Sequence, residues 1–424
     1  MMTSRERVSR AIEHMEPDRV PLDLGGSIVS GMQVSTVYLL RQALNLDPPG
    51  TPVRVTEPFQ MLGEIKPDLW NALGVDVTSL SGTGTIFGFK VGNWKPWTTF
   101  DGTPVLVPGD FNTDPEPSGD ILQYPQADKS ARASGRMPKD GFYFDTIVRA
   151  EPVDDSKLRV EDNLEEFGPL ADDEINHFAR EAERLYSQTD KAIFLFVPGT
   201  SFGDIALVPG ASLRQPKGIR DPEEWYMSTV YRRDHIYKIF EGQCEIGVGN
   251  LARLYEAVGN RVTVALTVAT DFGLQSGTFL SPKSYRDLFQ PFHKRLNDWV
   301  HKNTKWKTMI HSCGSAWVLM EDFIGAGFDV FNPVQCSAIN MSPAQLKSAF
   351  GDSICFWGGG VDTQYTLPFG SPEEVRQEVR ERINIFGPGG GFVFNTTHNV
   401  QAQTPVANVI AMYEAVREFG KYPL

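Results

Sequence analysis

Cysteines and long apolar runs are scarce in this sequence, and both shortages narrow the class of protein. The 424 residues include four cysteines: Cys244, Cys313, Cys336 and Cys355. Four are too few for a disulfide framework in so long a chain, and such low usage is typical of a reducing compartment. The longest apolar stretches, 192–197 and 262–269, are far shorter than the ~20 residues that span a bilayer. Residues 1–18 carry charges throughout and lack the apolar core of a secretory signal. We therefore expect a cytoplasmic protein without a membrane segment.

Positive charge is also in short supply. Lys and Arg number 40 against 53 Asp and Glu, which gives a formal net charge of -13. This balance argues against a nucleic acid or an anionic membrane as the main partner. Hydrophobic residues make up 41% of the chain, a fraction typical of folded domains with a large buried core. A small molecule is therefore the expected ligand.

Several common catalytic motifs are absent as well. The sequence has no Gly-x-Ser-x-Gly elbow and no paired Cys-x-x-Cys zinc module. Its glycine clusters at 358–360 and 387–391 lack the spacing of a dinucleotide or phosphate loop, so we expect turns there. These absences argue against an α/β-hydrolase, a zinc ribbon and a nucleotide-binding fold.

Short apolar runs alternate with amphipathic stretches over the C-terminal two-thirds of the chain. The runs lack polar alternation, which favours strands covered on both faces, and we expect them at 192–197, 262–268, 305–310, 328–334, 354–357 and 391–394. Helix starts follow several of them, as in Ser342-Pro343 and Ser371-Pro372, because a polar side chain caps the helix and proline suits its first position. Both sites also have the spacing of a capping box, with Gln345 and Glu374 three residues on. This order predicts an α/β fold, and polar residues just past the strand ends favour a (β/α)8 TIM-type barrel over an open sheet.

Residues 79–153 depart from this rhythm. They are rich in Gly, Pro, Asp and aromatic residues, and they contain the turn sequences Phe100-Asp101-Gly102 and Lys139-Asp140-Gly141. We expect them to form a β-rich insertion in a single barrel domain that spans residues 1–424. Such an insertion suits either a cover over the barrel mouth or a contact in a homodimer.

The sharpest chemical signal is His311-Ser312-Cys313-Gly314, at the end of a predicted strand. Residues two apart on an extended segment point the same way, so the imidazole and the thiol can converge, and both are good zinc ligands. Two later strand ends offer a third ligand, which is His398 or, as the alternative, Cys336. Three ligands with an open fourth position are typical of catalytic zinc. A hydrogen bond to substrate is the competing interpretation for His398, and simple packing is the competing one for Cys336.

Carboxylates and amides at other strand ends form a second set of candidates. Asp271 is the favoured catalytic carboxylate, either as a general base, as a substrate ligand or as a support for a metal ligand. The expected substrate-binding residues are Asp23, Gln335, Asp362 and Asn399. For the two aspartates of that set, capping or bracing of the local loop is an equally good interpretation.

As a set, these residues resemble the uroporphyrinogen decarboxylase superfamily, and within it the zinc- and corrinoid-linked methyltransferase branch. The motifs that carry the resemblance are Asp-Phe-Gly-Leu-Gln at 271–275, Leu-Ser-Pro at 280–282, His-Ser-Cys-Gly at 311–314, Asn-Pro-Val-Gln at 332–335, Gly-Gly-Val-Asp-Thr-Gln at 359–364, and His398 six residues ahead of Thr404-Pro405. The similarity covers most of the chain from about Ala192 onward, together with residues 3–26.

The resemblance implies a (β/α)8 barrel whose site lies at the carboxyl ends of the strands. In the methyltransferase branch the His-x-Cys-Gly motif supplies two zinc ligands, matched here by His311 and Cys313, and a later cysteine supplies the third. This chain has His398 at that third position. The arginine-bearing N-terminal segment of the decarboxylase is not matched, since residues 19–26 contain Arg19 alone, which disfavours uroporphyrinogen as the substrate.

The resemblance therefore predicts a zinc-dependent methyltransferase that moves a methyl group between a small substrate or acceptor and a corrinoid. The chain has no corrinoid-binding His motif, so a corrinoid of the cobalamin type is expected on a separate partner protein. One alternative is a metal-independent decarboxylase or lyase that acts on a small cyclic or aromatic acid, with Asp271 and His398 as its acid–base pair. The other is a non-catalytic barrel subunit.

Overall fold

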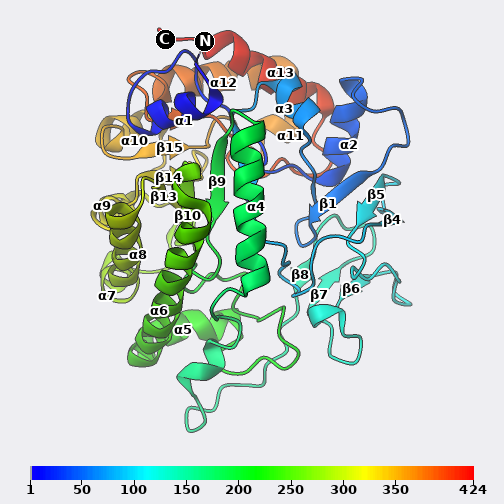
Figure 1. Cartoon of the computed structure of the whole chain (residues 1–424), viewed down its shortest axis with the longest axis vertical. Coiled ribbons are helices and arrows are strands. Elements are labelled where there is room, and N and C mark those ends of the chain that lie inside the picture. The colour runs from blue at the N-terminus through cyan, green and yellow to red at the C-terminus, as the bar shows by residue number, and fades with distance from the viewer. Residues whose placement is uncertain (1) are drawn as a thin grey trace.

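The computed structural model describes residues 2–424 and is built around a curled sheet of parallel strands (Figure 1). In order across the sheet these are β16 (Phe392–Val393), β15 (Cys355–Trp357), β14 (Val330–Asn332), β13 (Lys307–His311), β10 (Val264–Ala269), β9 (Ala192–Phe196) and β3 (Val77–Leu80). Every neighbouring pair in this sheet is parallel. Each predicted apolar run overlaps one of these strands, and β3 is the strand that the prediction lacked.

Residues 20–24 close the sheet into a barrel. Leu22 forms a parallel bridge with Phe394, and the N–H of Asp23 donates to the Phe394 carbonyl at 2.8 Å. On the other side, the N–H of Asp76, directly ahead of β3, donates to the Leu22 carbonyl at 2.8 Å. The segment therefore fills the gap between β16 and β3 and acts as the eighth strand. The predicted (β/α)8 TIM-type architecture is confirmed.

Inward-facing side chains fill the barrel, and helix α1 (Ser4–Ile12) covers one end of it. Ala11 of α1 accepts a backbone hydrogen bond from the segment just ahead of β16, so the helix lies at the amino ends of the strands. The apolar interior includes Met309 of β13 and Val330 of β14. Because side chains alternate along a strand, His311 and Asn332 share the inward face two residues further on. The carboxyl end of the barrel interior is therefore polar.

Helices cover the outside of the barrel. The longer ones are α2 (Val34–Ala43), α4 (Asp172–Gln188), α5 (Pro222–Tyr231), α6 (Arg233–Val258), α8 (Gln290–Asn303), α12 (Pro372–Phe386) and α13 (Val406–Phe419). The shorter ones are α3 (Pro67–Leu73), α7 (Pro282–Leu288), α9 (Met320–Gly325), α10 (Pro343–Phe350) and α11 (Thr366–Phe369). The capping box at Ser371 and Glu374 forms as predicted at the start of α12. The one expected at Ser342 was wrong: no side chain caps α10, and Gln345 instead lines a surface groove beside Trp317.

Smaller sheets lie to one side of the barrel (blue to cyan, right side of Figure 1). Strands β1 (Val53–Glu57), β2 (Leu62–Gly63), β4 (Lys95–Thr98) and β5 (Pro104–Val107) form a mixed sheet, and β6 (Ile121–Gln123), β7 (Gly135–Met137) and β8 (Asp145–Thr146) form an antiparallel one. Chain reversals occur at the two predicted turns, between β4 and β5 and between β7 and β8. A short hairpin of β11 (Gly273–Leu274) and β12 (Gly277–Thr278) follows β10.

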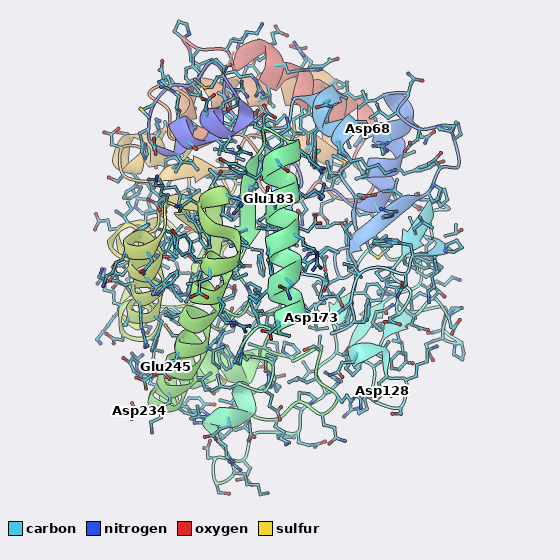
Figure 2. The ribbon with its side chains drawn as sticks, viewed as in Figure 1. Asp68, Asp128, Asp173, Glu183, Asp234 and Glu245 are labelled. Carbon is cyan, nitrogen blue, oxygen red and sulfur yellow. The ribbon has the colours of Figure 1, made fainter. Side chains whose placement is uncertain are left out.

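Acidic side chains are spread over the outer elements. Figure 2 labels six of them, on α3, in the loop between β6 and β7, on α4 and on α6: Asp68, Asp128, Asp173, Glu183, Asp234 and Glu245. Several are paired, as in the exposed ion pair of Asp173 with Lys90 at 2.9 Å. The excess negative charge is therefore distributed over several elements. Within residues 2–424, none of the helices combines the length and the apolar character that crossing a membrane requires.

Candidate metal centre

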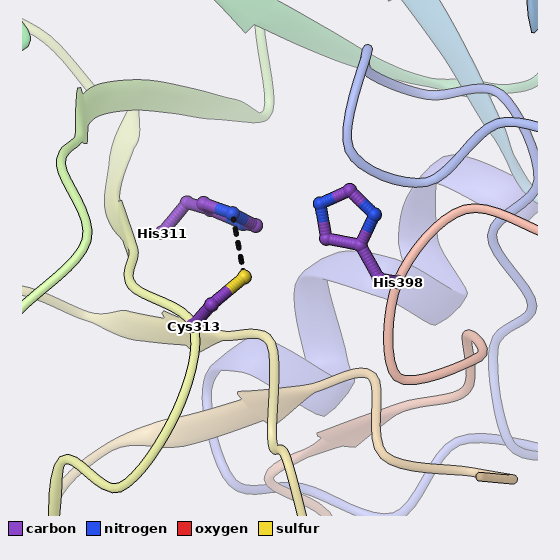
Figure 3. A group of neighbouring side chains, drawn as sticks. All are labelled: His311, Cys313 and His398. Carbon is purple, nitrogen blue, oxygen red and sulfur yellow. Dashed lines mark hydrogen bonds between the residues drawn. The ribbon is translucent and has the colours of Figure 1, made fainter. Parts of the chain in front are cut away.

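His311 and Cys313 meet at the carboxyl end of β13. His311 is the last residue of the strand, and Cys313 lies in the loop that follows. The His311 Nε2 atom is 3.5 Å from the Cys313 Sγ atom, and His398 faces the pair from a neighbouring loop (Figure 3). The structure thus brings together the imidazole and the thiol of the His-x-Cys motif.

His398 completes a group of three candidate ligands. It follows β16, and its ring centroid is 5.4 Å from that of His311, with 66° between the ring planes. One ligand atom from each of His311, Cys313 and His398 lies within 4.8 Å of the other two. Cys336 lies outside this group, and its thiol is directed at the Val334 carbonyl at 3.4 Å. The geometry therefore favours His398 over Cys336 as the third ligand.

The three side chains suit zinc in chemistry, and His311 and Cys313 also have the spacing of two zinc ligands. With Zn–N at 2.0–2.1 Å and Zn–S at 2.3 Å, tetrahedral angles place a nitrogen and a sulfur ligand about 3.6 Å apart. The observed separation between His311 Nε2 and Cys313 Sγ, 3.5 Å, matches that value. Imidazole and thiolate are preferred zinc ligands, and a three-residue set leaves a fourth position for an exchangeable ligand.

Burial keeps all three side chains neutral near pH 7. Burial lowers the pKa of His311, and it lowers the pKa of His398 to about 4 with a further contribution from the neighbouring His311. Burial also raises the pKa of the Cys313 thiol well above its usual range, and the Asp271 carboxylate adds to that increase. Both imidazoles therefore have a lone pair available, whereas a metal must displace the thiol proton in order to bind.

Asp271 supports the loop that carries Cys313. Its Oδ1 atom accepts the Cys313 backbone N–H at 2.7 Å and lies 3.9 Å from His311 Nε2. The loops behind these residues touch through two glycines: a Cβ atom on Gly314, whose φ is +80°, would lie 2.3 Å from the carbonyl carbon of Gly273. Direct backbone contact between the loops therefore fixes Asp271 beside the candidate ligands.

Two of the predicted substrate-binding residues brace loops next to this group. Gln335 Oε1 accepts the Gly314 backbone N–H at 2.7 Å. Asp362 Oδ1 accepts the backbone N–H groups of Gln364 and Tyr365 at 2.8 and 2.6 Å. Both side chains therefore hold the shape of the barrel mouth, and their contact with a substrate stays a prediction.

Asn399 lies beside a cavity at the junction between the barrel and the side sheets. Its side chain accepts the Gly31 N–H and donates to the Ile28 carbonyl and to Gln60. The cavity has a volume of about 140 Å³, and its lining includes four amide and three aromatic side chains: Gln33, Gln60, Asn399, Gln401, Phe59, Tyr143 and Phe144. Because Asn399 is next to His398 in the chain, the cavity borders the loop that carries this candidate ligand, and contact of Asn399 with a substrate stays a prediction.

Asp23 is buried in the barrel wall, and its contact with a substrate stays a prediction. Its side chain is only 1% exposed. The carboxylate accepts the Trp357 indole N–H at 2.8 Å and the Gly26 N–H at 2.9 Å. Burial raises the pKa of Asp23 to about 6. Asp23 therefore joins the closing segment to β15 inside the barrel wall.

Three residues near the centre were missed by the sequence-based prediction. Asn332 Oδ1 is 2.6 Å from His311 Nδ1, and its place on the inward face could have been found from the alternation after Val330. Asp204 lies in the long loop after β9, where burial and the charge of Asp271 raise its pKa to about 7. The ring of Tyr226 of α5 stacks on that of Phe279, with 4.7 Å between the ring centroids. Burial raises the pKa of Tyr226, and the charges of Asp271 and Asp204 add to that increase. No short motif marks the last two residues, because tertiary packing alone brings them to the site.

Comparison with known proteins supports the resemblance. Residues 247–419 match the uroporphyrinogen decarboxylase (URO-D) family. The uroporphyrinogen decarboxylase of Mannheimia succiniciproducens is 25% identical over 186 residues, which cover 40% of this chain and 49% of that protein. The uroporphyrinogen decarboxylase of Synechococcus sp. (strain JA-2-3B'a(2-13)) is 31% identical over 139 residues, 33% of this chain and 38% of that one. The chain thus spans about half the length, or less, of these curated relatives.

A solved structure extends the similarity in fold to the whole chain. A methyltransferase from Methanosarcina mazei superposes with a TM-score of 0.56 at 16% sequence identity, and the match covers 99% of each chain. This similarity concerns the fold, which is the closed barrel described above. The family match therefore covers residues 247–419, and the similarity in fold extends over the whole chain.

Proposed function

We propose that this protein is a zinc-dependent methyltransferase that moves a methyl group between a small substrate or acceptor and a corrinoid carried on a separate protein. The observation that carries the proposal is the convergence of His311, Cys313 and His398 within 4.8 Å at the carboxyl ends of the barrel strands. This is the end at which barrel enzymes place their chemistry. The name of the Methanosarcina mazei neighbour, a methyltransferase, agrees with the proposal.

In this proposal His311, Cys313 and His398 hold the zinc ion. When bound there, zinc would lower the pKa of a coordinated nucleophile or polarise a leaving heteroatom. Asp271 keeps the Cys313 loop in place through the backbone N–H that it accepts at 2.7 Å. Gln335 does the same for Gly314 from the other side. The residues around the ligands thus keep the thiol aimed at the two imidazoles.

The pairing of Arg7 and Arg19 with a buried carboxylate argues against a tetrapyrrole substrate. Arg19 pairs with the buried carboxylate of Asp76 at 2.7 Å, and Arg7 pairs with the same carboxylate at 2.6 Å. Both guanidinium groups therefore form ion pairs within the barrel wall and are not free to bind a substrate. A substrate with many carboxylates, such as uroporphyrinogen, would need free cationic side chains in the mouth.

Turnover by a double variant tests the metal requirement directly. Replacing both His311 and Cys313 by Ala should remove the metal and lower methyl transfer, measured with free methylcobalamin as the corrinoid probe, to the level of the buffer. The Cys336→Ala variant is the matched control, because its thiol lies outside the ligand group, and it should keep both metal and turnover. Unchanged turnover in the double variant would rule out the proposal that catalysis depends on zinc. Turnover of a metal-free protein on a carboxylic acid would instead favour acid–base chemistry by Asp271 and His398.

A further inference from the structure

We propose that Asn332 is the positioning residue that fixes the tautomer and the ring orientation of His311, so that Nε2 of His311 is the atom presented to the metal. The inference rests on the proposed zinc function. It concerns a residue outside the ligand group, and it adds a requirement that the His-x-Cys motif does not contain.

Two hydrogen bonds determine how the Asn332 amide is oriented. Its Nδ2 atom donates to the Trp357 backbone carbonyl at 2.8 Å, and a carbonyl oxygen can only accept. The Oδ1 atom is therefore the end that faces His311, 2.6 Å from Nδ1. Because Oδ1 has no proton to donate, Nδ1 must carry one and act as the donor. The neutral imidazole is then protonated at Nδ1, and its lone pair is at Nε2.

The remaining nitrogen points at the candidate metal position. His311 Nε2 is 3.5 Å from Cys313 Sγ and 3.9 Å from an Asp271 oxygen. The opposite tautomer would place a proton between Nε2 and the thiol and would leave Nδ1 and Asn332 Oδ1 as two acceptors in contact. Fixing a ligand histidine through its second nitrogen commonly changes metal affinity by 10–100-fold.

The fold holds Asn332 rigidly enough for this role. His311 and Asn332 are register partners in the parallel pair of β13 and β14. Asn332 is 1% exposed and His311 is 5% exposed. The accepting residue, Trp357 of β15, is itself anchored by its indole N–H on Asp23 at 2.8 Å. Neighbouring strands therefore support the imidazole by a continuous set of contacts.

The tautomer can be measured in the unmodified protein. Long-range proton–nitrogen spectra of the metal-free chain, labelled with 15N-histidine, distinguish the two neutral tautomers, and the His311 signals are assigned by their loss in a His311→Gln variant. We expect the Nδ1–H form at pH 7.5. Observation of the Nε2–H form would overturn the inference without any assumption about metal.

Zinc affinity of matched variants provides the second test. Asn332→Leu removes the acceptor and should weaken zinc binding, measured by competition with a chelator, by 10–100-fold. Asn332→Asp keeps an oxygen acceptor for the Nδ1–H group and should restore most of the affinity. Asn297→Leu is the control, because Asn297 of the outer helix α8 is another fully buried amide, whose Nδ2 donates to the Ala326 carbonyl at 3.0 Å. That variant should keep the affinity of the unmodified protein.

The outcomes separate this inference from the proposed function. Zinc binding by the unmodified protein with equal affinity in Asn332→Leu would overturn the role of Asn332 and leave the zinc proposal standing. An equal loss of affinity in Asn332→Leu and Asn297→Leu would overturn it too, because the effect would then be general destabilisation. Failure of the unmodified protein to bind zinc would overturn the zinc proposal, and the metal role of Asn332 with it.

Discussion

His293 is a buried imidazole outside the metal centre, and it should make the stability of the protein depend on pH. The side chain is fully buried and bonded to the Tyr285 hydroxyl at 3.0 Å, and burial lowers its pKa from 6.5 to about 3. Below pH 6.5 His293 is protonated in the unfolded chain but stays neutral in the folded chain. The free energy of unfolding therefore falls as the pH falls toward 3. Between pH 7.5 and pH 5.0 this residue should account for a loss of about 2 kcal/mol.

Urea unfolding of the unmodified protein and of His293→Phe at both pH values measures this contribution. Other titrating groups are common to the two proteins, so the difference between their pH dependences isolates His293. The variant should lose about 2 kcal/mol less than the unmodified protein over this range. Equal pH dependence in the two proteins would contradict the assignment of a neutral, buried imidazole.

Residue by residue, the site was predictable where a strand end was visible. His311, Cys313 and His398 each follow an apolar run, and the structure brings them together. Asn332 was missed because its importance lies in the register of β14 against β13, which one sequence does not reveal. The depth of Asp23 was not predictable either, since it depends on Trp357, more than 300 positions away along the chain.

The contact between the hairpin of β11 and β12 and the Cys313 loop sets a strict limit at Gly314. A Cβ atom there would lie 2.3 Å from the Gly273 carbonyl carbon, and the backbone φ is +80°. A Gly314→Ala substitution should therefore lower the free energy of unfolding by about 3 kcal/mol or more, from backbone strain and from forced separation of the two loops. Denaturant titration measures the loss.

Gly389→Ala is the matched control for that experiment. Its φ is +77°, but a Cβ atom there meets nothing within 4 Å. This variant isolates the backbone strain alone and should lose about 1–2 kcal/mol. Equal losses at the two positions would show that the loops can separate freely, contrary to the packing described here.

Elements were predictable in kind but less so at their ends. The apolar runs located the strands of the barrel sheet from β9 onward, and the Ser371 capping box located the start of α12. The capping box predicted at Ser342 does not form. The correct spacing is necessary for a capping box but not sufficient, and the Gln345 side chain lines a surface groove instead. β3 was missed because the residues after it leave the strand–helix rhythm, so that no helix pattern follows the strand directly.

Closure of the whole barrel depends on the buried carboxylate of Asp76. This side chain is fully buried and accepts hydrogen bonds from Arg7, Arg19 and the Leu22 N–H at 2.6, 2.7 and 2.9 Å. An Asp76→Asn substitution keeps the shape but leaves the Arg19 guanidinium without its counter-charge, and Arg7 then has Asp18 alone as its acidic partner, at 2.6 Å. The free energy of unfolding should fall by about 3 kcal/mol.

An exposed ion pair serves as the control for that variant. Asp173 and Lys90 are 67% and 68% exposed at the side chain. The Asp173→Asn substitution should change the free energy of unfolding by less than about 0.5 kcal/mol. A small effect at Asp76 as well would mean that the closing segment holds the barrel by its backbone hydrogen bonds alone.

At the scale of the molecule, the alternation of strands and helices was enough to predict the barrel. The manner of closure was not predictable, since Pro21 and Asp23 interrupt the apolar character of residues 20–24. They are held in place by bonds to Phe394 and Asp76, which come from opposite ends of the sequence. Long-range partners of this kind appear only once the chain is folded.

Zinc content is the measurement that tests the central claim most directly. The protein, purified without chelator, is compared by elemental analysis with His311→Ala, His398→Ala and Cys336→Ala. The account predicts about one zinc ion per chain in the unmodified protein and in Cys336→Ala, as a single three-residue site requires, and loss of the ion in both histidine variants. Absence of zinc from the unmodified protein, or its retention in both histidine variants, would contradict the account.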